Sequence, residues 1–100
     1  MNKEEVDASI ALFVKNVYTV VDMKGYQISY VERYAGVSTG YISRVLKGAK
    51  GLSFRTAILF ADAVGESLTD LLNKDYQNVA VEKQIQYLEE RIQDLKSQLK

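Results

Sequence analysis

The residues of this chain that could do chemistry are basic side chains concentrated in its middle third. Residues 24–55 hold six lysines and arginines against a single acidic residue, Glu32, so this segment has a net charge of +5. Residues 1–23 and 56–100 have net charges of −2 and −3, and the whole chain is neutral. A basic segment between acidic ends is typical of an anion-binding surface, with nucleic acid as the first candidate; a solvated helix face is the alternative.

Catalytic chemistry is limited by the residue types that the sequence lacks. The 100 residues include no Cys and no His. This excludes disulfides, thiol nucleophiles and imidazole bases, and it removes the usual ligands of zinc and haem. The 13 acidic residues form no recognisable catalytic motif. We therefore expect no enzyme activity, no catalytic residues, no metal site and no cofactor.

The elements that must position the basic residues are expected to be helices. The composition, 47% hydrophobic and 26% charged, is that of one folded domain, and six Gly and no Pro leave few helix breakers. No apolar run approaches the roughly 18 residues that a membrane span needs. The polar, acidic N-terminus does not resemble a signal peptide. We expect an all-α, cytoplasmic protein that does not contact a membrane.

Two short helices are expected within the basic segment. The first covers about residues 28–35 and the second about 39–47, and each is followed by a glycine, Gly36 or Gly48, that can end a helix. The apolar residues of the second helix share one face, which leaves small and basic residues outside. Two short helices joined by a tight, Gly-containing turn fit a helix-turn-helix, whose second helix enters the major groove of DNA.

An ordered series of motifs accompanies these helices. It consists of Gly36-Val37-Ser38, Ile42-Ser43-Arg44-Val45, Gly48, residues 59–65 (LFADAVG), Ser67-Leu68 and Leu71-Leu72. Over about residues 5–73, this series resembles the lambda-repressor-like, Cro-type helix-turn-helix regulators of the XRE family. The resemblance implies a five-helix DNA-binding domain, expected over residues 1–75. Glu32 stands where the family commonly has a small residue; we expect its carboxylate to reach solvent, with a hydrogen-bonded carboxylate as the alternative.

The resemblance also implies which residues contact double-stranded DNA. Arg44 is the strongest candidate for reading a base, because its planar guanidinium can bond both O6 and N7 of guanine; a phosphate contact is the alternative. The full base-reading set is expected to be Thr39, Gly40, Tyr41, Ser43 and Arg44, with Gly40 permitting close approach. Contacts to the DNA backbone are expected from Gln27, Ser38, Lys47, Lys50 and Arg55.

The C-terminal segment, residues 76–100, is expected to form a helix for self-association. Its apolar residues recur at alternating spacings of four and three: Val81, Ile85, Leu88, Ile92, Leu95 and Leu99. So narrow a stripe is typical of a coiled coil; a hairpin back onto the domain is the alternative. Ile and Leu at alternating core positions favour a parallel dimer. The free energy gained by burying them outweighs the repulsion between Arg91 and the partner's Lys96. An antiparallel pair and a tetramer remain open.

These features together predict a dimeric, sequence-specific transcriptional repressor that binds a palindromic operator and takes no small-molecule ligand. The alternative is a protein-interaction module, in which a degenerate helix-turn-helix binds another regulator. In that case the contacts would be made by the coiled coil or by Tyr30, Tyr34 and Tyr41.

Overall fold

The computed structural model describes residues 1–48 and 50–99, including the side chains of all these residues except 79–81 and 83. The described residues form six α-helices in chain order. They are α1 (Lys3–Lys24), α2 (Ile28–Ala35), α3 (Tyr41–Leu46), α4 (Phe54–Val64), α5 (Leu68–Asn73) and α6 (Tyr76–Gln98). The expected all-α class, with five helices in a domain and a sixth after it, is confirmed.

Short polar side chains begin most of these helices. Asn2 caps α1 by accepting a hydrogen bond from the Glu5 amide at 2.8 Å. Ser53 and Ser67 cap α4 and α5 in the same way, and Asp75 caps α6. Each cap pairs amide groups that a helix start leaves without a partner.

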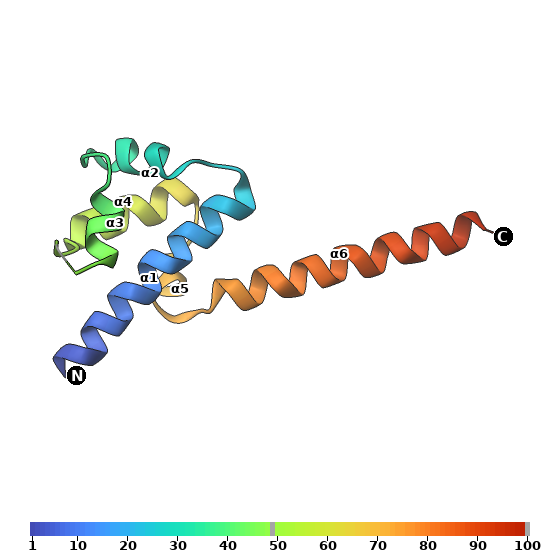
Figure 1. The fold of residues 1–100 in the computed structure, drawn as a ribbon, viewed down its shortest axis with the longest axis horizontal. Coiled ribbons are helices and arrows are strands. Elements are labelled where there is room, and N and C mark those ends of the chain that lie inside the picture. Colours follow the sequence, from blue (N-terminus) through green and yellow to red (C-terminus); the bar gives the residue numbers. More distant parts are fainter. Residues whose placement is uncertain (49, 100) are drawn as a thin grey trace.

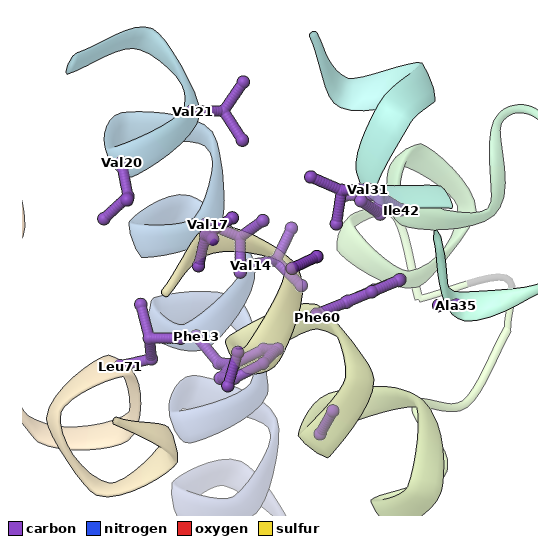
Figure 2. Packing of buried hydrophobic residues seen from close by; sticks show 14 of the residues in the cluster. Phe13, Val14, Val17, Val20, Val21, Val31, Ala35, Ile42, Phe60 and Leu71 are labelled. Atoms are coloured by element: carbon purple, nitrogen blue, oxygen red, sulfur yellow. The ribbon is translucent and has the colours of Figure 1, made fainter. Parts of the chain in front are cut away.

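The core of the domain is built around α1. Its apolar side packs against α3, α4 and α5, while α2 packs on α4, and Figure 2 shows the buried side chains of all five helices converging. The largest fully buried side chains are Phe13, Phe60, Ile42 and Leu71. Val31 and Ala35 of α2 and Ile42 and Val45 of α3 are also buried in this cluster, so the packing of their inner faces on α1 and α4 sets the positions of the two helices.

Glu32 on α2 lies inside the domain, so the expectation that it reaches solvent is wrong. Its side chain is buried, and Oε2 accepts a hydrogen bond from the backbone N–H of Ile42 at 3.2 Å. Ile42 lies in the first turn of α3, and the residue at the N-cap, Gly40, has no side chain that could cap this helix. The Glu32 carboxylate therefore supplies the cap from a neighbouring helix.

The sixth helix leaves the domain as a separate rod. Figure 1 shows α1–α5 gathered together and α6 extending away from them, which gives the molecule extents of 58 × 31 × 21 Å. Tyr76, the first residue of α6, is nonetheless buried in the domain core. The boundary expected after residue 75 would therefore separate Tyr76 from the residues it packs on. Within the described residues, every helix is too short or too polar to cross a bilayer.

Candidate nucleic-acid interface

The α2–turn–α3 unit is held together by apolar residues on its inner side. Val31 and Ala35 of α2 and Ile42 and Val45 of α3 are buried. Gly36 ends α2 in the left-handed conformation with φ of 72°, which reverses the chain direction at small steric cost. This anchoring leaves the opposite side of α3 facing outward.

The second helix begins later than the sequence predicts. Gly40 has φ of 86°, a left-handed conformation that cannot continue into the α-helix, so α3 starts at Tyr41 rather than at residue 39. Thr39 and Gly40 therefore belong to the turn. At the other end Lys47 is the C-cap, immediately after the last helical residue.

Tyr41 does not fit its expected role as a base reader. Its side chain is only 5% exposed, and its ring packs edge-on against Phe60 with the centroids 5.9 Å apart. Its hydroxyl donates a hydrogen bond to the carbonyl oxygen of Gly51 at 3.2 Å. The ring has enough apolar surface to join the core, so Tyr41 anchors α3 to α4 instead of contacting a base.

Arg44 lies on the outer side of α3 and is held over the preceding turn. Its Nη2 donates to Ser38 Oγ at 2.7 Å, and its Nη1 donates to the carbonyl oxygen of Thr39 at 3.3 Å. A Cβ atom at Gly40 would lie 3.1 Å from Arg44 Nη1, so the glycine makes room for the guanidinium. A guanidinium has five N–H donors, and these two bonds leave the others available to a ligand.

The residues expected to contact the DNA backbone are all exposed: Gln27, Ser38, Lys47, Lys50 and Arg55. Two of them are placed by contacts within the domain. Lys50 Nζ lies 5.3 Å from the centre of the Tyr41 ring, in cation–π geometry, and Ser38 accepts the bond from Arg44. Ser43 and Arg44, from the base-reading set, are half-exposed, and Thr39 is exposed.

One basic residue of the middle segment belongs elsewhere. Lys24, at the end of α1, forms an ion pair with Glu66 at 3.3 Å and donates to the carbonyl oxygen of Val64. Its ammonium group therefore links α1 to the α4–α5 connection, away from α3. The anion-binding character of the segment rests on its remaining arginines and lysines.

Comparison with known families agrees with this geometry. Residues 19–71 match the family model described as helix-turn-helix. The chain belongs to the XRE-type, lambda-repressor-like helix-turn-helix family. Neither a curated protein nor a solved structure matches the chain. This helix-turn-helix protein is accordingly a DNA-binding regulator, in a family that is not normally enzymatic, and the match ends at Leu71, before α6.

The apolar stripe on α6 of this helix-turn-helix protein is open to solvent. Ile85, Leu88, Ile92 and Leu95 are each between 50% and 55% exposed. Leu99, just after the helix, is 87% exposed. The side chain of Val81, the first expected member of the stripe, lies outside the described side chains. The hairpin alternative is wrong for the described members, because they do not pack on the domain.

Two residues that organise the helix-turn-helix domain were not assigned roles from the sequence. Glu32 caps α3, and Asn16 on α1 is buried, with hydrogen bonds to the ends of α5 and α6. A sequence signal existed for Asn16, because it falls within the apolar stripe of α1, three residues after Phe13. A polar residue at such a position must find partners inside the protein.

Proposed function

We propose that this helix-turn-helix protein is a transcriptional repressor that binds a palindromic operator as a dimer. The observation that carries the proposal is the exposed apolar stripe on α6, on a helix that extends away from the DNA-binding domain. An isolated helix with such a stripe is marginal in water, so it gains stability by pairing. A second copy of the chain brings an identical stripe.

The DNA contacts that we propose follow the outer side of α3. Thr39, Ser43 and Arg44 read base edges in the major groove, and Gly40 permits a close approach of the turn to the DNA. Lys47, at the end of the helix, binds a phosphate. The remaining backbone contacts come from Gln27, Ser38, Lys50 and Arg55.

The pairing that we propose for α6 is a parallel two-stranded coiled coil. Ile85 and Ile92 occupy the first core position, and Leu88 and Leu95 the second, the combination that favours two parallel strands. Each Leu or Ile buried contributes roughly 1.5–3 kcal/mol, against about 0–1 kcal/mol for an exposed pair of like charges. The core preference therefore outweighs the repulsion between Arg91 and the partner's Lys96.

The direction of α6 supports this arrangement. In Figure 1, α3 lies at one end of the long axis of the molecule and α6 extends toward the other. A parallel coil of two such helices joins the domains at one end and leaves both copies of α3 accessible. Two recognition helices can then enter successive major grooves, about 34 Å apart on one face of the duplex.

The proposal is tested by comparing three chains in sedimentation and in binding to DNA selected from a random pool by the intact protein. The first is intact, the second carries Ile92→Asp in the stripe, and the third carries the control Gln93→Asp one position along the same helix. A further chain ending at Asn78 keeps Tyr76 in the core and removes the stripe.

We expect the intact chain and the Gln93→Asp variant to be dimers at micromolar concentration that prefer a palindrome. The Ile92→Asp variant and the truncated chain should be folded monomers that bind a single half-site weakly. A truncated chain that still dimerises would place the interface in the helical domain. A dimer that selects no duplex from the pool would favour the protein-interaction alternative.

A further inference from the structure

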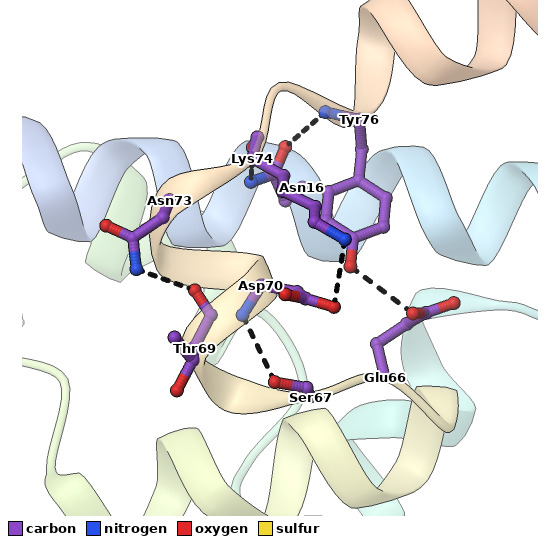
Figure 3. Close-up of polar contacts among 8 residues, drawn as sticks. All are labelled: Asn16, Glu66, Ser67, Thr69, Asp70, Asn73, Lys74 and Tyr76. Carbon is purple, nitrogen blue, oxygen red and sulfur yellow. Dashed lines mark hydrogen bonds and ion pairs between the residues drawn. The ribbon is translucent and has the colours of Figure 1, made fainter.

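Asn16 ties α1 to the junction between α5 and α6. Its Nδ2 donates hydrogen bonds to the carbonyl oxygens of Leu71, at 2.8 Å, and Lys74, at 2.7 Å. Its Oδ1 accepts from the backbone N–H of Tyr76 at 3.2 Å. The side chain is 1% exposed, and its bonds to Leu71 and Tyr76 are buried, whereas the bond to Lys74 is partly buried. One amide thus pairs two carbonyl groups at the end of α5 and the first amide of α6. Figure 3 shows in close-up the bonds of Asn16 to Lys74 and Tyr76.

A second set of contacts fixes the same junction from the other side. The Tyr76 ring is buried in the domain, and its hydroxyl donates to Glu66 Oε2 at 3.3 Å. Glu66 Oε1 in turn pairs with Lys24 Nζ at the end of α1. Asp75 caps α6 at this point by accepting from the amides of Gln77 and Asn78. The first turn of α6 is therefore held by both its backbone and its side chains.

We propose that Asn16 is a positioning residue that sets the direction in which α6 leaves the domain, and thereby the spacing of half-sites that the protein accepts. This inference rests on the proposed dimer. An apolar residue at position 16 could fill the same volume, but it would remove the side-chain partner of two buried backbone groups, the Leu71 carbonyl and the Tyr76 N–H, and of the partly buried Lys74 carbonyl. The hydrogen bonds of the amide add a directional constraint that apolar packing alone lacks.

Because α6 is long, a small change in its direction at the junction produces a large displacement at its far end. Its 23 residues span about 34 Å at 1.5 Å per residue. A rotation of about 10° at the junction moves the far end by about 6 Å, which exceeds the roughly 3.4 Å rise of one base pair. In a dimer joined through α6, a loose junction would let the spacing between the two DNA-binding domains vary by more than one base pair, whereas a fixed junction selects one spacing.

The rigidity of the junction can be measured within one chain. Because the protein has no Cys, spin labels can be attached at Arg33→Cys on α2 and Glu90→Cys on α6, with labelled chains diluted in unlabelled protein. We compare the distance distributions in the otherwise unchanged protein, in Asn16→Leu and Asn16→Ser variants, and in an Asn73→Ala control. Asn73 also donates an amide N–H to a backbone carbonyl, that of Thr69, but on the exposed side of α5.

We expect one narrow distribution in the otherwise unchanged protein and in the control, and a broadened one in the Asn16 variants. Far-UV circular dichroism and binding to a single half-site establish that each variant is folded, and the serine variant serves where leucine prevents folding. An Asn16 variant with an unchanged, narrow distribution would overturn the positioning role. A broad distribution in the otherwise unchanged protein would show that the junction is not fixed.

The spacing itself is tested on the duplex selected by the intact protein, with about five base pairs, half a helical turn, inserted between its half-sites. The intact protein and the Asn73→Ala control should lose about 100-fold or more in affinity as the second domain disengages. The Asn16 variants, whose junction is looser, should lose less affinity on the spaced duplex than the intact protein does. The same loss in the Asn16 variants would overturn the spacing role. An intact chain that binds each half-site independently would overturn the proposed dimeric operator as well. The distance measurement within one chain would then show whether the junction is nevertheless fixed, which distinguishes a failed dimer from a flexible junction.

Discussion

Removing the Glu32 carboxylate tests how the recognition helix is held in place. Glu32 is 3% exposed, and its Oε2 accepts from the N–H of Ile42, a residue that is itself fully buried. In a Glu32→Ala variant this N–H would have lost its acceptor. We therefore expect the variant to be less stable than the unchanged protein.

The expected size of the effect follows from two contributions of opposite sign. The first is the lost hydrogen bond, which contributes about 1.5–3 kcal/mol when its acceptor is charged. The cost of about 0.5–2 kcal/mol for losing a helix N-cap is a second estimate of this same interaction. The removal of a buried charge offsets part of this loss. We expect the Glu32→Ala variant to lose about 2 kcal/mol, which lowers Tm by about 8–16 °C in a domain of this size.

Thermal unfolding followed by far-UV circular dichroism measures the effect, and Glu32→Gln is the matched control. The glutamine oxygen can still accept from Ile42, so we expect this variant to lose about 1 kcal/mol or less. A rise in Tm for Glu32→Ala would refute the reasoning, because it would show that burying the carboxylate costs more than its hydrogen bond returns. Equal losses in both variants would show that the acceptor at this position is unimportant.

Three further predictions concern DNA binding and pH. Arg44→Ala should cost about 1–3 kcal/mol on the selected duplex and relax selection at one base position, as measured by competition with single-base variants; an equal loss on random DNA would make Arg44 a phosphate contact. Lys47→Ala should weaken binding to all sequences alike and reduce the log–log salt slope by about 0.9, whereas the control Lys74→Ala should leave the slope unchanged. Burial, with the nearby charge of Glu66 and its hydrogen bond, raises the pKa of Tyr76 from 10.0 to about 12. The folded state therefore holds this proton more tightly than the unfolded state, so the free energy of unfolding falls as the pH rises from about 10 to 12. The urea midpoint should fall less steeply over this pH range in a Tyr76→Phe variant.

Much of the fold could be predicted because it depends on local signals in the chain. The spacing of apolar residues along α1, the cap at Asn2 and the glycine at position 36 are each properties of a few neighbouring residues. Hydrophobic periodicity and capping act over one or two helical turns, so they are legible without tertiary information. The same holds for the order of motifs that marks the helix-turn-helix.

The candidate site was less predictable for a residue that is suited to both the buried and the exposed side of a helix. Tyr41 was assigned to the outer face of the second helix, yet its ring packs on Phe60 and belongs to the core. An aromatic residue with a hydroxyl group suits both environments, and the choice depends on a partner 19 positions away in the sequence. The start of α3 was likewise decided by the left-handed conformation of Gly40, which a glycine permits but does not require.

The sequence by itself determined that this protein is helical, that its basic residues gather around a helix-turn-helix, and that its C-terminal helix carries a narrow apolar stripe. Only the tertiary structure decided what the buried polar residues do. Glu32 could have reached solvent, and Asn16 could have been an isolated polar residue on α1. Their partners, the N–H of Ile42 and the backbone at the α5–α6 junction, lie 10 and 55–60 positions away. A buried polar side chain is stable only when such groups meet it in space, and that meeting depends on how all the helices pack.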